Sequence, residues 1–151
     1  MRFLFALLFA LGVPALASAS PAPSISATRE GVAIGGYDPV AYFTEGRPVA
    51  GSPEFTLRWQ GATWRFASAQ SRARFEANPE AYAPAFGGYC AWAISQNYIA
   101  RGDPQVWRIV DGRLYLNFNR RAQALWEADL EGSISRGNVN WPTVLANADN
   151  R

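Results

Sequence analysis

The sequence predicts an α+β fold in which small antiparallel β-hairpins carry packed short helices. Two segments show the two-residue period of a half-buried strand and then turn back, the first at Gln60-Gly61 and the second at Asp111-Gly112. A helical segment with a polar capping residue in front of it follows each hairpin. At 151 residues the chain has the length of one domain.

The first residues are typical of a secretory signal. Met1-Arg2 is a short positive start, residues 3–16 are almost wholly apolar, and Ala17-Ser18-Ala19 fits the small-x-small pattern before a cleavage point. The apolar run is too short to span a bilayer. We therefore expect residues 1–19 to be a signal peptide cleaved near Ala19. The mature protein is expected to be periplasmic or secreted, with no membrane span.

The mature chain is expected to begin with a flexible leader at residues 20–34, which are small, polar and proline-bearing. A single domain is expected at residues 35–145. Near its start, Asp38-Pro39 predicts a helical turn, because aspartate is a good N-cap and proline is tolerated in the first helical turn. Val40 and Phe43 of that turn are expected to face inward.

The first hairpin should have one aromatic face, formed by alternate residues of its two strands. Ser68 is expected to cap the helix that follows, and Asn78-Pro79 is expected to end that helix and begin the next helical turn. Gly87-Gly88 predicts a tight bend or a close backbone approach. The alternating residues are Phe55, Leu57, Trp59, Trp64 and Phe66.

The two-residue turn of the second hairpin also predicts its register. Ile109 should lie opposite Leu114, and Trp107 opposite Leu116, with Arg108 and Tyr115 on the other face. No internal repeat beyond the two hairpins is evident. Asn119 is expected to cap a helix with an apolar stripe, and Trp141 in the tail from Ser133 onward should dock onto the domain. The stripe consists of Ala122, Leu125, Trp126 and Leu130.

Residue counts exclude several classes of function. The chain has one cysteine and no histidine, so one chain cannot form an internal disulfide, a Ser-His-Asp or Cys-His catalytic group, or an ordinary mononuclear zinc or copper site. All 14 basic residues are arginine, and they are interspersed with 12 acidic residues. This near balance of charge does not predict a nucleic-acid-binding surface.

Several motifs resemble the YHS domain, a short hairpin-plus-helix module also found in copper-transporting ATPases and some monooxygenases. They are Asp38-Pro39-Val40, Trp64-Arg65-Phe66-Ala67-Ser68, Phe75, Asn78-Pro79-Glu80 and Tyr82. Together with residues 36–43, 87–90 and 111–117, the pattern resembles the stand-alone exported YHS-domain proteins of bacteria. The resemblance implies a YHS-like module, completed here by a C-terminal hairpin and helices, and it implies metal handling.

The chain departs from this family at the metal ligands. In the metal-associated YHS domains, cysteines occupy the positions of Ala41, Ala67 and Ser71. Only Cys90, outside that trio, can supply a soft ligand, so a periplasmic copper site would have to be centred on Cys90. It would need a second ligand from another protomer or molecule.

Cys90 has three interpretations. It is a small buried hydrophobe, a Cu(I) ligand, or a reactive thiol, and the last needs a base or a lowered pKa that only an arginine or a helix terminus could provide here. Gly87 and Gly88 before it would let a ligand approach closely, and Tyr89 and Trp92 could frame an aromatic pocket. This gives an alternative function, a metal-free module that binds a small apolar ligand or a protein in an aromatic cleft near Gly87 to Trp92.

Tyr37, Asp38 and Tyr42 complete the candidate site. The simpler interpretation is that Asp38 caps a turn and the tyrosines pack. The alternative places the Asp38 carboxylate beside Cys90, as a hard ligand or an acid–base partner. Taken together, the residues favour an exported binding module over an enzyme.

Overall fold

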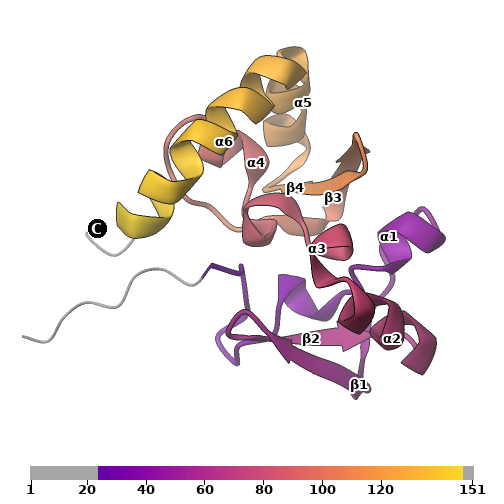
Figure 1. The fold of residues 1–151 in the computed structure, drawn as a ribbon. Helices are drawn as coiled ribbons and strands as arrows, with labels where there is room; N and C mark the ends of the chain where they lie inside the picture. Colours follow the sequence, from indigo (N-terminus) through magenta and orange to yellow (C-terminus); the bar gives the residue numbers. More distant parts are fainter. Residues whose placement is uncertain (1–23, 148–151) are drawn as a thin grey trace, which may run out of the picture.

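The computed structural model describes residues 24–147 and has an α+β fold (Figure 1). Within these residues, six α-helices accompany two antiparallel sheets of two strands each. The predicted signal peptide, residues 1–19, lies outside this range. No helix between residues 24 and 147 combines the length and the apolar character needed to cross a membrane.

The elements follow one another in two similar series. The first series is the 3-10 helix η1 (Ile34–Gly36), α1 (Ala41–Thr44), β1 (Ser52–Trp59), β2 (Ala62–Phe66), α2 (Ala69–Ala77) and α3 (Pro79–Tyr82). The second is η2 (Ala85–Gly88), α4 (Ala91–Ser95), β3 (Asp103–Val110), β4 (Arg113–Asn117), α5 (Arg120–Ala128) and α6 (Leu130–Asn147).

Both hairpins form as predicted. β1 pairs with β2, and β3 pairs with β4, each across the expected two-residue turn. In the second hairpin Ile109 lies opposite Leu114, and Trp107 lies opposite Leu116. The predicted register is therefore confirmed, because alternation and turn length together leave one pairing that buries a single face.

The predicted helix caps are also confirmed. The Ser71 N–H donates to the Ser68 hydroxyl oxygen at 3.1 Å at the start of α2. The Ala122 N–H donates to Asn119 Oδ1 at 2.8 Å at the start of α5. Asn78 ends α2 and precedes α3, as the Asn-Pro pair indicates.

The similarity of the two series extends well beyond the hairpins. β1 and β3 have eight residues, β2 and β4 have five, and α2 and α5 have nine. β3, β4 and α5 begin 51 residues after β1, β2 and α2, respectively. The register shifts at the same place in each hairpin, between Ser52 and Thr56 in one and between Asp103 and Trp107 in the other.

The segments in front of the hairpins match as well. Residues 34–36 have φ angles of 41°, 64° and 82°, and residues 86–88, 52 positions later, have 54°, 61° and 84°. We call residues 34–82 the first repeat and residues 86–133 the second repeat. Figure 1 shows the first repeat, in purple and magenta, below the second, in red and orange. The prediction of no repeat beyond the hairpins is therefore wrong.

The repeat is hard to see in the sequence because most equivalent core positions keep burial but not identity. One signal is present and was missed: Gly35-Gly36-Tyr37 recurs as Gly87-Gly88-Tyr89. Trp64 corresponds to Tyr115, and Phe75 corresponds to Trp126, and all four are buried. A core accepts different apolar side chains of similar volume, so the backbone is retained while the residues change.

The first core shows how the two repeats are joined. Trp64, Phe66 and Phe75 form an aromatic cluster whose ring centroids lie 5.0 to 5.2 Å from that of Phe75. Leu114 and Leu116 of β4 are buried in the same core. One face of the second hairpin therefore completes the core of the first repeat, which makes the two repeats one packed unit.

Residues 24–34 do not form the flexible leader that we predicted. Ile25 is only 4% exposed, and the Ser26 N–H donates to the Gly87 carbonyl oxygen at 2.8 Å. Val32 forms a parallel bridge with Thr63 beside the first hairpin. Small and polar composition suggested a loose segment, but this strip packs across both repeats, and its backbone groups are hydrogen-bonded there.

The C-terminal segment is also more regular than expected. Residues 133–147 belong to α6 and not to an extended tail. Trp141 docks as predicted, with its ring centroid 5.9 Å from that of Phe86 and 6.0 Å from that of Tyr89. α6 packs on α4 and α5 in the second repeat.

The predicted apolar stripe is correct for two of its four members. Ala122 and Trp126 are buried, but Leu125 is 45% exposed and Leu130 belongs to α6. Asp129 interrupts the helix between α5 and α6, so the stripe does not continue.

Candidate functional site

Cys90 is held at the junction between η2 and α4. Its N–H donates to the Ala100 carbonyl oxygen at 2.8 Å, and its thiol lies 3.6 Å from Asn117 Oδ1. The same oxygen accepts the Trp92 N–H at 3.0 Å. Asn117 therefore fixes both the thiol and the first turn of α4, and Cys90 is only 1% exposed.

A pocket of about 340 Å³ opens next to this thiol, and we call it the Cys90 pocket. Phe118 and Leu125 are 47% and 45% exposed, among the most exposed large hydrophobic side chains of residues 24–147. The rings of Trp92 and Tyr98 meet edge to face at 6.1 Å. The lining consists of Cys90, Trp92, Ala93, Tyr98, Ala100, Phe118, Asn119, Arg121, Ala122 and Leu125.

The polar atoms of this pocket are few. Burial raises the pKa of the Tyr98 hydroxyl, and the nearby Cys90 raises it further, so the phenol is neutral at ordinary pH. Arg121 is the one charged side chain in the lining. A largely apolar wall with a small number of polar groups is the usual character of a small-molecule site.

The first repeat has a pocket in the equivalent place, which we call the Asp38 pocket. Its lining is polar where the Cys90 pocket is apolar: Ser71 stands in place of Ala122, and Arg74 in place of Leu125. Asp38 is the residue of the first repeat that is equivalent to Cys90 of the second repeat. The lining consists of Asp38, Val40, Ala41, Thr44, Glu45, Ala67, Ser68, Gln70, Ser71 and Arg74.

Asp38 has a structural role in that pocket. Oδ1 accepts the Val40 N–H at 2.9 Å, and Oδ2 accepts the Ala67 N–H at 2.9 Å and the Ser71 hydroxyl. The carboxylate is 1% exposed and joins the start of α1 to the end of β2 and to α2. Asp38 therefore holds the turn in front of α1, although the N-cap of that helix is Val40 and not Asp38 as predicted. The alternative that places Asp38 beside Cys90 is wrong.

The three tyrosines of the predicted site do not line the Cys90 pocket. The Tyr42 hydroxyl donates to the Pro104 carbonyl oxygen at 2.7 Å, and burial raises its pKa. The Tyr37 hydroxyl accepts Gln105 Nε2 at 2.9 Å. Tyr89 packs on Trp141, so of the two aromatic residues expected to frame the pocket, only Trp92 does so.

The donor set does not fit a soft metal ion. The positions that carry cysteine in metal-associated YHS domains, Ala41, Ala67 and Ser71, all line the Asp38 pocket, but they provide no thiolate or imidazole there. In the Cys90 pocket the thiol has no second soft ligand. Among residues 24–147, no three side chains of His, Cys, Asp or Glu are grouped so that they could hold a metal.

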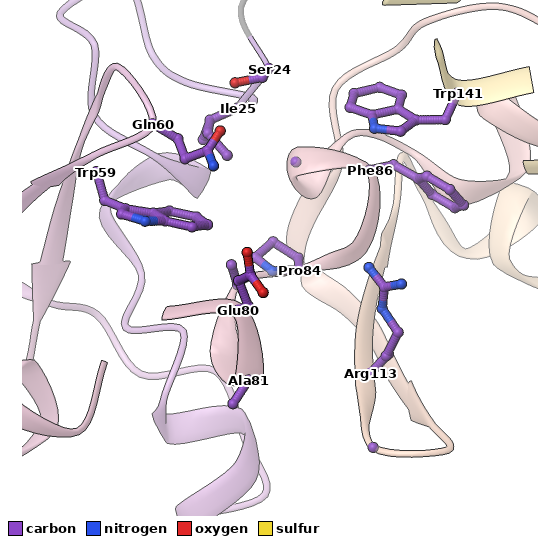
Figure 2. A pocket seen from close by; sticks show the side chains of 13 residues that line it. Ser24, Ile25, Trp59, Gln60, Glu80, Ala81, Pro84, Phe86, Arg113 and Trp141 are labelled. Atoms are coloured by element: carbon purple, nitrogen blue, oxygen red, sulfur yellow. The ribbon is translucent and has the colours of Figure 1, made fainter. Parts of the chain in front are cut away.

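A third hollow lies between the two repeats, and we call it the inter-repeat cleft. It has a volume of about 670 Å³, and Figure 2 shows Trp59 on one side and Trp141 with Phe86 on the other. Its segments come from both repeats, from residues 24–25 and from α6, so local sequence patterns gave no signal of it. The lining consists of Ser24, Ile25, Trp59, Gln60, Glu80, Ala81, Ala83, Pro84, Phe86, Gly87, Gly112, Arg113 and Trp141.

Comparisons of the chain with protein-family models, with curated proteins and with solved structures found no match. The likeness to the YHS domain rests on the residues quoted above. The function is therefore argued from the pockets themselves.

Proposed function

We propose that this protein is an exported YHS-type binding module that takes a small apolar ligand in the Cys90 pocket. The observation that carries the proposal is the exposure of Phe118 and Leu125 at a pocket that also presents Trp92 and Tyr98. Apolar side chains left partly in water gain free energy when a ligand covers them. A volume of about 340 Å³ lies within the usual range for small-ligand pockets.

The Asp38 pocket supports this interpretation. The same backbone carries Ser71 and Arg74 in the first repeat, where the second repeat has Ala122 and Leu125. The fold thus accepts polar side chains at these positions, and packing alone does not require an exposed leucine there. An apolar lining that stability does not require is the expected mark of ligand recognition.

The Cys90 pocket should bind a neutral aromatic probe such as N-phenyl-1-naphthylamine, with an increase in probe fluorescence. Leu125→Arg should weaken this binding about tenfold or more, because it removes the exposed apolar surface that the ligand would cover and places a charge there. Titration of the probe into both proteins measures the effect.

The matched control is Arg74→Gln, at the equivalent position of the first repeat. It changes an exposed side chain of the Asp38 pocket, so probe affinity should stay within about twofold of the unchanged protein. Equal probe affinity in the unchanged protein and Leu125→Arg contradicts the proposal.

Copper handling through Cys90 is the competing function and predicts a different result. We expect no submicromolar Cu(I) site in a titration of the reduced protein against a competing chelator, and no difference between the unchanged protein and Cys90→Ala. The physical reason is that a single buried thiol lacks the second soft ligand that Cu(I) requires. Tight stoichiometric binding that disappears in Cys90→Ala would replace our proposal with copper handling.

A further inference from the structure

The inter-repeat cleft has two indole side chains on opposite sides. Trp59 ends β1 of the first repeat, and Trp141 lies on α6, which packs on the second repeat. Both are half-buried, and Figure 2 shows both at the edge of the same open space. Indole faces bind apolar side chains and also attract cations, so this pair suits a ligand with an apolar body.

Two side chains of opposite charge also reach this space. Glu80 comes from α3 of the first repeat, and Arg113 begins β4 of the second repeat. Both are exposed, and neither has a side-chain hydrogen bond or ion pair with another of residues 24–147. In Figure 2 Glu80 lies near Pro84 at the centre of the view, and Arg113 points upward below Phe86 and Trp141.

The cleft also has a buried apolar part. Ile25, Pro84 and Phe86 are buried, and the Gly87 carbonyl oxygen accepts the Ser26 N–H at 2.8 Å. A volume of about 670 Å³ is large enough for two or three amino-acid residues. The cleft therefore combines a buried apolar part with one exposed positive and one exposed negative group.

We propose that the inter-repeat cleft binds a short zwitterionic peptide of two or three residues. Its terminal ammonium group pairs with Glu80, its terminal carboxylate pairs with Arg113, and an apolar side chain lies between Trp59 and Trp141. The guanidinium group can hold a carboxylate through two parallel hydrogen bonds, which gives direction as well as affinity. This proposal does not depend on a ligand in the Cys90 pocket.

A zwitterion fits these groups better than a ligand with one charge or none. A neutral apolar ligand would cover both Glu80 and Arg113 and remove water from them without replacing its hydrogen bonds. A ligand with a single charge would pair with either Glu80 or Arg113. It would repel the remaining group or leave its charge without a partner. Only a ligand that carries both a positive and a negative charge gives Glu80 and Arg113 each a partner of opposite charge.

The test uses the tripeptide Ala-Phe-Ala in three forms: with free termini, with an acetylated amino terminus, and with an amidated carboxyl terminus. Binding is measured on the purified chain by titration calorimetry and by tryptophan fluorescence. We expect the free tripeptide to bind saturably and each blocking group to weaken it about fivefold, the upper end of the effect of an exposed ion pair.

Two variants assign the contacts. Glu80→Gln should abolish the effect of acetylation and keep the effect of amidation, while Arg113→Gln should do the reverse. Both side chains are exposed, so both variants should unfold at the temperature of the unchanged protein. Absence of saturable binding at millimolar peptide, equal affinity for all three forms, or a failure of this crossed pattern overturns the proposal.

Leu125→Arg serves as the control for the site. It alters the Cys90 pocket and not the inter-repeat cleft, so it should bind the free tripeptide as the unchanged protein does. A loss of tripeptide affinity in Leu125→Arg would place the peptide in the Cys90 pocket and overturn the assignment.

Discussion

Asp38→Ala should lower the free energy of unfolding by about 3–4 kcal/mol, a large effect for one small side chain. The substitution leaves the N–H groups of Val40 and Ala67 and the hydroxyl of Ser71 without their acceptor. Each buried donor left unpaired costs roughly 1–3 kcal/mol. Chemical denaturation followed by tryptophan fluorescence measures the loss.

Two controls separate the hydrogen bonds from simple loss of volume. Asp38→Asn keeps one carbonyl oxygen in place, and we expect it to cost about half as much. Cys90→Ala removes the side chain at the equivalent position of the second repeat, where Asn117 provides the acceptor for the Trp92 N–H, and should cost about 1 kcal/mol. If Asp38→Ala and Cys90→Ala lower the free energy of unfolding equally, the Asp38 carboxylate does not hold α1, β2 and α2 together.

Gly87→Ala should lower the free energy of unfolding by roughly 3 kcal/mol. Residue 87 has a φ of 61°, and a Cβ atom built there overlaps the carbonyl oxygen of Ser24. Relief of the overlap requires residues 24–26 to leave the surface of the second repeat, with loss of the Ser26–Gly87 hydrogen bond. The measurements are thermal unfolding and hydrogen exchange at Ser26.

The repeat supplies a matched control for this substitution. Gly35 occupies the equivalent position in the first repeat, has a φ of 64°, and a Cβ atom there meets only Pro104 Cγ at 3.5 Å, an ordinary contact. Gly35→Ala should therefore cost only about 1 kcal/mol, the backbone strain alone. If both variants lose the same stability, the packing of residues 24–26 against Gly87 contributes nothing to the fold.

The two repeats give one backbone arrangement two different chemical linings. In the Asp38 pocket, the carboxylate accepts hydrogen bonds from two backbone N–H groups and from the Ser71 hydroxyl, and these bonds hold three elements together. In the Cys90 pocket, Asn117 takes over the capping of α4, so the lining is free to be apolar. In our proposal, the first repeat serves mainly for stability and the second repeat binds the ligand.

Local features of this protein were predictable from the sequence. The two hairpins, their register, the caps at Ser68 and Asn119 and the break at Asn78-Pro79 all depend on residues within a few positions of one another. Turn length, alternation and capping act over such short distances, so these elements could be read without knowing the rest of the fold.

The sequence alone limits the possible metal chemistry, because one cysteine and no histidine leave few soft donors. It also placed the candidate ligand site in the aromatic segment from Gly87 to Trp92. Cys90 and Trp92 line one of the pockets found there, and Gly87 lines another.

Only the tertiary structure decided which residues share a site. It separated Asp38 from Cys90 by placing them in equivalent pockets of two repeats, packed residues 24–34 against the domain, and left Leu125 exposed. The inter-repeat cleft joins Trp59 to Trp141, 82 positions apart in the chain. Such contacts depend on how whole elements pack, and packing depends on volume and burial more than on residue identity, so no local pattern records them.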